Sequence, residues 1–337
     1  TVLSDGFHVE YWMDGAGNVG GWGNVLVVDD TLDHKKKDVN LRRFNDKWFV
    51  IEGIEANIYY RNYQTLELRM GDGGGKITIT ACADNTVISG GPSFNEYVVQ
   101  PTNEGLVEVG TVWIDEPEAG TAGNKLRYND FYQKSEQNAE KQIKHIVKSD
   151  QICSDPPDIY DIRFTHGGFS EIEMKLSNSK DHVDVQSMLE ACKLVLNTGS
   201  GDDSVKVWKE ATDNTKFEAH INGYQGNNVL VADFERDFDG KMTENGIRRS
   251  PGQDGSWKDW SLLYIHMQKV TMNFKSLSKL DIQTTQAKIE TFINTKGEHD
   301  NTVNIFKIKS PVNIKTDTGK DQFNIVGGSP DGSTSIK

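Results

Sequence analysis

The segment LVLNTGSGDDSVKV, residues 194–207, holds two runs of alternating apolar residues on either side of a turn rich in Gly and Asp. An apolar residue at every second position is the pattern of a β-strand with one buried face. Glycine tolerates the positive φ of a tight corner, and aspartate hydrogen-bonds to nearby backbone groups. The segment therefore predicts two short strands joined by a sharp corner.

The same pattern recurs along the chain, so the segment is one copy of a repeat. The other copies are LELRMGDGGGKITIT (66–80), EMKLSNSKDHVDV (173–185), AHINGYQGNNVLVA (219–232), FINTKGEHDNTVNI (292–305) and VNIKTDTGKDQFNIV (312–326). The acidic or amide residue before the second strand aligns them at Asp181, Asp203, Asn228, Asp300 and Asp321. Neighbouring copies lie 21, 22 or 25 residues apart, and the 72 residues from Asn228 to Asp300 hold about three further steps.

This period predicts an all-β chain, a parallel β-solenoid (β-helix) with coils of about 21–25 residues. The 32 glycines supply the corners, and only 8 prolines interrupt strands that need every N–H. The predicted inward positions are Leu194, Leu196, Val205, Val207, Val229, Val231, Ile314, Phe323 and Ile325. An antiparallel sandwich is the structural alternative, because hairpins also place Gly and Asp between alternating runs.

Residues 198–206, TGSGDDSVK, resemble the haemolysin-type (RTX-like) calcium-binding nonapeptide, GGxGxDx followed by an apolar residue, with Thr198 at the first glycine. The segments around Asp181, Asn228 and Asp321 resemble the degenerate repeat of large surface-exposed β-solenoid proteins. The resemblance implies calcium bound between successive turns, with Asp203 and Asp321 as ligands. Residues 189–197 do not continue the motif. The alternative is a corner at which each Asp caps backbone amides.

The pattern divides the chain into three parts. Residues 1–124 form an N-terminal β-region, either a cap or the first coils, and residues 159–337 form the repeat region. Between them, residues 125–158 hold an amphipathic helix, predicted over 129–149, and a linker with two prolines. The helix prediction depends on an apolar stripe of Phe131, Ala139, Ile143, Ile146 and Val147.

The polar segment 233–260 is predicted to be a long loop, and loops of this length in compact folds are often functional. Its Glu235, Asp237 and Asp239, followed by Gly240, resemble the first ligands of an EF-hand calcium loop. The glutamate expected at the twelfth position is absent. A solvated acidic turn is the alternative.

Other residues offer catalytic and carbohydrate-binding candidates. Arg248 and Arg249 follow the acidic group, and in β-helix polysaccharide lyases an Arg or Lys abstracts the α proton of a uronate while a cation neutralises its carboxylate. His220 is the third catalytic candidate. Adjacent arginines in an acidic loop also simply balance its charge.

Three aromatic residues, Trp257, Trp260 and Tyr264, close the same segment. Exposed on a β-helix flank, they would stack on sugar rings; buried, they would seal the loop onto the strands below.

Composition excludes several classes of function. A net charge of −13 without a Lys/Arg cluster argues against nucleic acid as a partner. No apolar run reaches the roughly 18 residues of a membrane span. The three cysteines match neither a disulfide framework nor a zinc pattern.

These features predict an extracellular or cell-surface β-solenoid with structural or adhesive work, and they favour a non-enzymatic role while leaving enzymatic activity open. Self-association into a filament or matrix, neighbouring surface proteins and polysaccharide are the expected partners, because solenoid ends expose strand edges. The alternative is a polysaccharide lyase or glycoside hydrolase on the same scaffold. A trimeric viral receptor-binding fibre is a third reading.

Overall fold

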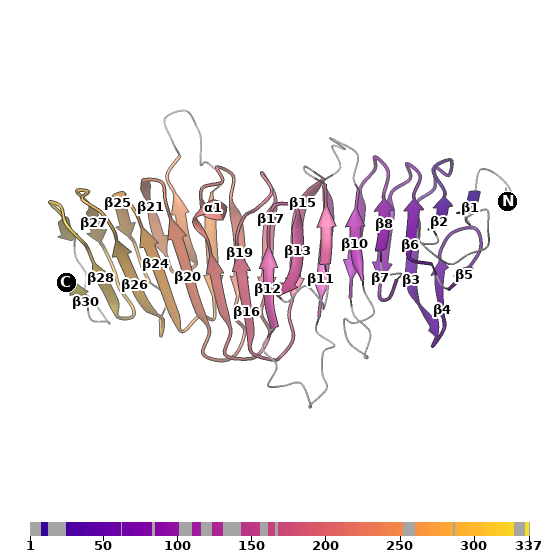
Figure 1. Cartoon of the computed structure of the whole chain (residues 1–337). Coiled ribbons are helices and arrows are strands. Elements are labelled where there is room, and N and C mark those ends of the chain that lie inside the picture. Colours follow the sequence, from indigo (N-terminus) through magenta and orange to yellow (C-terminus); the bar gives the residue numbers. More distant parts are fainter. Residues whose placement is uncertain are drawn as a thin grey trace. The chain divides into compact units, whose positions relative to one another are not determined.

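The computed structural model describes residues 8–12, 25–61, 63–82, 85–100, 110–115, 123–130, 143–155, 161–165, 168–251, 260–285, 287–326 and 334–336. These residues form strands β1 to β30 and one four-residue helix, α1 (Lys209–Thr212) (Figure 1). The prediction of an all-β chain is confirmed.

The chain forms two compact units. Unit 1 comprises residues 1–135 and 150–175, and unit 2 comprises residues 136–149 and 176–337.

Unit 1 contains two sheets in which most neighbouring strands are parallel. The first has the order β1 (His8–Trp12), β2 (Val25–Asp29), β6 (Thr65–Arg69), β8 (Asn85–Ser89), β10 (Thr111–Ile114), β14 (Asp161–Phe164), β13 (Gln151–Asp155). The second has the order β15 (Phe169–Lys175), β11 (Asn124–Asn129), β9 (Asn95–Val99), β7 (Gly75–Ile79), β3 (Lys37–Asn45), β4 (Trp48–Glu52), β5 (Ile58–Tyr60).

Unit 2 also contains two sheets, called sheet A and sheet B below. Sheet A has the strands β12 (Ile143–Val147), β16 (Asp181–Val185), β18 (Ser204–Val207), β20 (Val229–Phe234), β24 (Lys269–Phe274), β26 (Glu290–Thr295), β28 (Val312–Lys315) and β30 (Thr334–Ile336), in that order. Sheet B has the order β17 (Lys193–Asn197), β19 (Glu218–Asn222), β23 (Ser261–Ile265), β22 (Gly246–Arg249), β21 (Phe238–Thr243), β25 (Leu277–Ile282), β27 (Thr302–Ile305), β29 (Gln322–Ile325).

From β16 onward the chain passes from one sheet to the other and back, except at β21–β23, which all lie in sheet B. Apart from β22, which pairs antiparallel with β21 and β23, the strands pair in parallel with the equivalent strand of the next repeat. His182 pairs with Ser204 and Ser204 with Val229, which reproduces the sequence intervals of 22 and 25 residues. Parallel strands buried against a second sheet need a continuous apolar inner face. Leu194, Leu196, Val205 and Val207 supply it and are fully buried, as predicted.

Two predicted inward positions are wrong. Val229 and Val231 are half-exposed, and Leu230 and Ala232 are buried in their place. Residues 229–232 are all apolar, so alternation alone does not select the buried set. Parallel pairing of Leu230 with Val205 selects it instead.

The last strand of sheet B departs from the pattern for a different reason. Phe323 is half-buried and Ile325 is 69% exposed, although they pair with the buried Val303 and Ile305. By the alternation of the strand, Phe323 and Ile325 belong to the inward-facing set. Among the described residues, however, no further strand of sheet B follows β29.

The predicted helix at 129–149 is wrong over its described second half. Residues 143–147 form strand β12, which pairs in parallel with β16. His145 and Val147 are fully buried, so the segment follows the strand period of two. β-Branched Ile and Val favour a strand where a neighbouring strand can pair. Residues 131–142 lie outside the described residues.

The long loop expected at 233–260 is also corrected. Its described part contains the end of β20 and a hairpin of β21 and β22, and β22 pairs antiparallel with β23. Met242 and Ile247 are fully buried, so the polar segment contributes apolar side chains to the core. Residues 252–259 lie outside the described residues.

Candidate functional site

Three of the residues that align the repeats, Asp181, Asp203 and Asn228, form one hydrogen-bonded column, called the corner column below. The backbone N–H of Asp181 donates to Asp203 Oδ1 (2.9 Å), and that of Asp203 donates to Asn228 Oδ1 (2.9 Å). The N–H of Asn228 in turn donates to Gln268 Oε1 (2.6 Å). Each side chain thus satisfies a backbone donor of the preceding repeat.

Two rungs of the corner column are buried carboxylates. Burial raises the pKa of Asp203 to about 6, against opposing hydrogen bonds from Thr198 and the Asp181 N–H, and the charge of Asp181 adds to the increase. Burial also raises the pKa of Asp181, although His145 Nε2 lies 3.6 Å from its Oδ1 and opposes the shift. The corner column therefore holds two carboxylic acids, Asp181 and Asp203, close together, whereas the next residue of the column, Asn228, is a neutral amide.

At the corner of Asp203, one carboxylate oxygen is used by the protein itself. Calcium takes six to eight oxygen ligands, whereas Asp203 Oδ1 is engaged by a backbone N–H and its side chain is buried. Successive turns also stack directly, since Gly201 N–H donates to Gln225 O (2.9 Å). A Cβ on Gly226 would lie 1.6 Å from Gly201 O.

Asp321 has the same role farther along the chain. Its Oδ1 accepts from the backbone N–H (3.1 Å) and Nδ2 (2.6 Å) of Asn301. Burial tends to raise the pKa of Asp321, but hydrogen bonds from Thr316 and Asn301 outweigh it and lower the pKa. Among the described residues, no group of three or more His, Cys, Asp or Glu side chains is placed to hold a metal ion.

The three carboxylates that resemble an EF-hand loop do not converge on a common point. Each has its own partner: Lys275 for Glu235, Ser278 for Asp237 and Ser250 for Asp239. Asp239 lies in strand β21, whose alternation turns neighbouring side chains to opposite faces. Burial tends to raise the pKa of Asp237, but hydrogen bonds from Ser278 and Ser276 outweigh it and lower the pKa.

The adjacent arginines lie on opposite faces of β22. Arg249 is 8% exposed, donates to the backbone carbonyl of Asp237 and lies with its guanidinium 5.3 Å from the centre of the Phe238 ring. Burial lowers the pKa of Arg249 to about 10. Arg248 is exposed, so only this arginine is available to a ligand on the outer face of sheet B.

Of the aromatic candidates, Trp260 is buried, as Arg249 is. Trp260 is 1% exposed, its Nε1–H donates to Thr212 O (2.9 Å), and it packs against the rings of Phe217, Phe234 and Phe238. The indole therefore seals the core and has no free face for a sugar. Trp257 lies outside the described residues.

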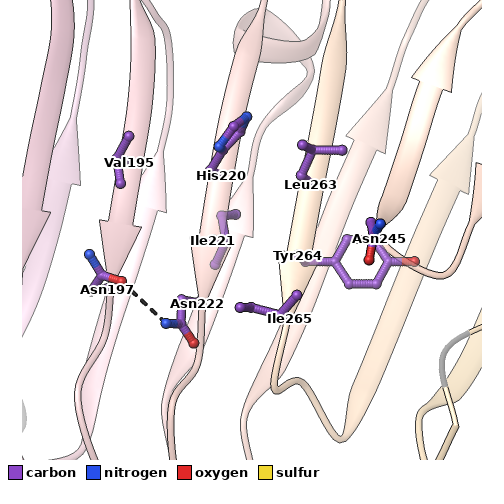
Figure 2. Close-up of a pocket in the computed structure, with 9 residues that line it drawn as sticks. All are labelled: Val195, Asn197, His220, Ile221, Asn222, Asn245, Leu263, Tyr264 and Ile265. Carbon is purple, nitrogen blue, oxygen red and sulfur yellow. Dashed lines mark hydrogen bonds between the residues drawn. The ribbon is translucent and has the colours of Figure 1, made fainter.

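Tyr264 belongs to the one surface feature of the described residues that gathers several candidates, a groove of about 380 Å³ on sheet B (Figure 2). We call this the sheet B groove, and its lining residues are Val195 and Asn197 of β17, His220, Ile221 and Asn222 of β19, Leu263, Tyr264 and Ile265 of β23, and Asn245 of the β21–β22 turn. Burial raises the pKa of the Tyr264 phenol, which therefore stays protonated.

The polar side chains of the sheet B groove are ordered by one another. Asn222 Nδ2 donates to Asn197 Oδ1 (3.3 Å; Figure 2). Asn222 Oδ1 lies 2.8 Å from His266 Nδ1, which is outside the groove lining. His220 Nε2 lies 3.0 Å from Glu218 Oε1. Burial and the charge of Lys193 lower the pKa of His220 more than Glu218 raises it, so the imidazole is neutral at pH 7.

His220 and Tyr264 were candidates on the sequence alone, but the amides beside them were not. Asn197 and Asn222 occupy the same outward position on neighbouring strands, since they pair in the β17–β19 register. The repeat alignment could have found them, because each directly follows the apolar run of its copy. Asn245 could not be found this way, because it lies in the hairpin that was expected to be a loop.

Among the described residues, no helix has the length and apolar character required to span a membrane. Comparisons of the chain with protein-family models, with curated proteins and with solved structures found no match.

Proposed function

We propose that this chain is an extracellular or cell-surface β-solenoid module with structural and adhesive work, and that it assembles with copies of itself. The observation that carries the proposal is the corner column, which links repeats at intervals of 22 and 25 residues through side chain to backbone hydrogen bonds. A scaffold of stacked coils needs such a bond at each corner, because the turn N–H groups otherwise lose their partners.

Further side-chain ladders support the same scaffold on its outer face. Asn294 Nδ2 donates to Asn273 Oδ1 (2.8 Å), and Asn273 Nδ2 donates to Asp233 Oδ1 (2.8 Å), across three successive strands of sheet A. Asn324 Nδ2 donates to Asn304 Oδ1 (2.8 Å) on sheet B. Stacked amides of this kind fix the register of parallel strands.

A pair of cysteines tests the coiled arrangement. In the double variant Asn273→Cys/Asn294→Cys, the substituted residues are direct neighbours in parallel strands, about 4.8 Å apart, which is within disulfide range. We expect a disulfide on oxidation, detected as a cross-linked peptide by mass spectrometry.

The matched control is Asn273→Cys/Asn304→Cys, which places the cysteines on sheets A and B and should not cross-link. The three native cysteines are buried and stay reduced in both variants. A cross-link in the control but not in the neighbouring pair would contradict the proposed stacking.

Self-association is supported by strand β29. It pairs with β27 on one edge, and at its end Ile325 and Val326 are 69% and 58% exposed. An apolar strand edge of this kind accepts another strand. Light scattering over a concentration series, with and without calcium, should show growing particles, and Ile325→Asp should reduce the growth. A monomer at every concentration would refute the assembly.

A second candidate function is a polysaccharide lyase, and the sheet B groove favours it. A neutral His220 beside Glu218 could accept a proton, and Arg248 lies two strands away across the sheet. The test is the ultraviolet absorbance of unsaturated products from alginate and pectate, compared between the natural chain and His220→Ala. No product from either polymer would refute the lyase.

A further inference from the structure

A row of cationic side chains crosses the outer face of sheet B beside the groove. The strand register places Lys193 opposite Glu218, Glu218 opposite Ser261, Ser261 opposite Arg248, and Arg248 opposite Lys241. Residues opposite each other in register lie on the same face of a sheet. Arg248 and Lys241 are exposed and lie on adjacent strands, so their charges are close.

The three cations of this row have no ion-pair partner among the described residues. Lys193, Lys241 and Arg248 form no salt bridge there, whereas Lys279 in the neighbouring strand pairs with Asp281 (3.3 Å). Unpaired cations held on a rigid sheet attract an anionic ligand.

The carboxylates that face the row are already engaged. Glu218 lies 3.0 Å from His220 Nε2, and Asp281 accepts from Asn304 Nδ2 (2.7 Å) as well as pairing with Lys279. Asp239 accepts from Ser250 Oγ (3.1 Å). Glu218 and Asp281 stand opposite Lys193 and Lys241 in the register and keep their negative charge, so the adjacent exposed pair Arg248 and Lys241 is the group that an anion would meet first.

The sheet B groove adds groups of a different chemistry, two to four residues farther along β17, β19 and β23 and at the β21–β22 turn. Asn197, Asn222 and Asn245 bring amides, which hydrogen-bond hydroxyl groups, and Leu263 and Ile265 bring apolar surface. The volume of about 380 Å³ is in the range of small-ligand sites. A ligand that fits both features carries carboxylates, hydroxyl groups and an apolar ring face.

An extended peptide fits this surface less well. β19 is paired on both edges, with β17 and β23, and β23 is paired with β19 and β22. Their backbone N–H and C=O groups are therefore occupied and cannot add a peptide strand. Recognition depends on side chains alone, which suits a polyhydroxylated ligand.

We propose that the sheet B groove and the row of Lys193, Arg248 and Lys241 bind an acidic polysaccharide, with carboxylates on the cations and hydroxyl groups on the amides. The inference rests on the proposed adhesive function, for which it names the ligand class.

Binding of polygalacturonate, measured by isothermal titration calorimetry with neutral dextran as the comparison polymer, tests the assignment. We expect binding of polygalacturonate alone, weakening as salt is added. The double variant Lys241→Gln/Arg248→Gln should lose about tenfold in affinity. Lys315→Gln, which removes an exposed lysine of sheet A, should bind as the natural chain does.

Equal binding of dextran, absence of binding to polygalacturonate, or equal losses in both variants would overturn the assignment. Unchanged circular dichroism and Tm in each variant ensure that a loss of affinity is not a loss of fold. The cross-link of the Asn273→Cys/Asn294→Cys variant separates the two proposals: if it forms while polygalacturonate does not bind, the ligand is wrong and the scaffold stands. If it does not form, the scaffold itself is wrong.

Discussion

Replacing Asp203 by Asn is expected to raise the free energy of unfolding at neutral pH. The side chain of Asp203 is 2% exposed, and its carboxylate must be charged above pH 6 in a place where burial and Asp181 both oppose that charge. Asn228 shows that an amide fits the corner column, since its Oδ1 accepts from the preceding N–H and its Nδ2 donates to Gly223 O and His266 O. An amide at position 203 would keep the acceptor and remove the charge.

The magnitude follows from the difference between the folded and unfolded pKa. Asp203 moves from 3.8 to about 6, and each unit is worth about 1.4 kcal/mol, so the charged carboxylate costs the folded state about 3 kcal/mol. The folded pKa is raised, so the folded state binds the proton more tightly. The cost is complete above the folded pKa and disappears as the pH falls from about 7 to about 4.

Urea denaturation at pH 7 and pH 4 measures this effect. Asp203→Asn should be more stable than the natural chain by about 1–3 kcal/mol at pH 7, because relaxation around the site reduces the full cost. The two should have nearly equal stability at pH 4. Asp317→Asn, which removes an exposed carboxylate, is the charge-matched control and should change stability little at either pH.

Two results would refute the reasoning. If Asp203→Asn destabilises the chain at pH 7, the carboxylate makes a favourable contact that its burial does not reveal. If the stabilisation is the same at pH 4 and pH 7, the charge is not its cause. Either result would remove the argument that the two acids of the corner column are energetically unfavourable at neutral pH.

Three more measurements test the packing and the corner chemistry. Trp260→Ala should lower the free energy of unfolding by about 3–5 kcal/mol in urea denaturation, because it leaves a cavity in the core and removes the hydrogen bond to the buried carbonyl of Thr212. A change below about 1 kcal/mol would contradict the burial of Trp260. Gly226→Ala should lower the free energy of unfolding by more than about 1 kcal/mol in the same measurement, because the φ of Gly226 is +119° and a Cβ there would clash with Gly201 O. No change in stability would mean that the turns are less tightly stacked. Calcium or a chelator should leave the Tm unchanged in differential scanning calorimetry, and a calcium-dependent increase would show that the corner at Asp203 binds the ion after all.

The repeat was predictable because its signal lies in side-chain type and spacing. Gly and Asp mark each corner, and the interval from Asp181 to Asp203 in the sequence is the interval of the parallel register. The strand period gave the buried face where a polar residue separates the apolar ones, as in 205–207. It failed at 229–232, where every residue is apolar and the neighbouring strand decides.

The two larger errors have a common cause. At 143–147 a helical stripe and a strand face share the same apolar residues, and pairing with β16 favours the strand. At 238–249 a polar segment forms a hairpin because β23 and β25 offer free edges on either side. In both segments a distant strand supplies the decisive hydrogen bonds, and a local pattern does not contain that partner.

The candidate site was predictable only in part. Sequence motifs pointed to Asp203, Asp237 and Arg249, which are engaged by the protein itself. The sheet B groove forms from unremarkable residues that three strands bring into line. Most of its residues, such as Asn197, Asn222 and Ile265, share outward parity, and this property becomes visible only when the strands are placed beside one another.

The direction of the inter-strand hydrogen bonds sets how the molecule would respond to mechanical force. In unit 2 the bonds that join β16, β18 and β20 point along the direction in which these strands succeed one another. Tension in that direction acts on the hydrogen bonds between one pair of strands at a time. The repeats should therefore separate one after another under modest force. Each step from one corner to the next frees 22 residues, or roughly 75 Å of extended chain. A chain built this way would extend by repeated small releases and could lengthen considerably before its last strands separate.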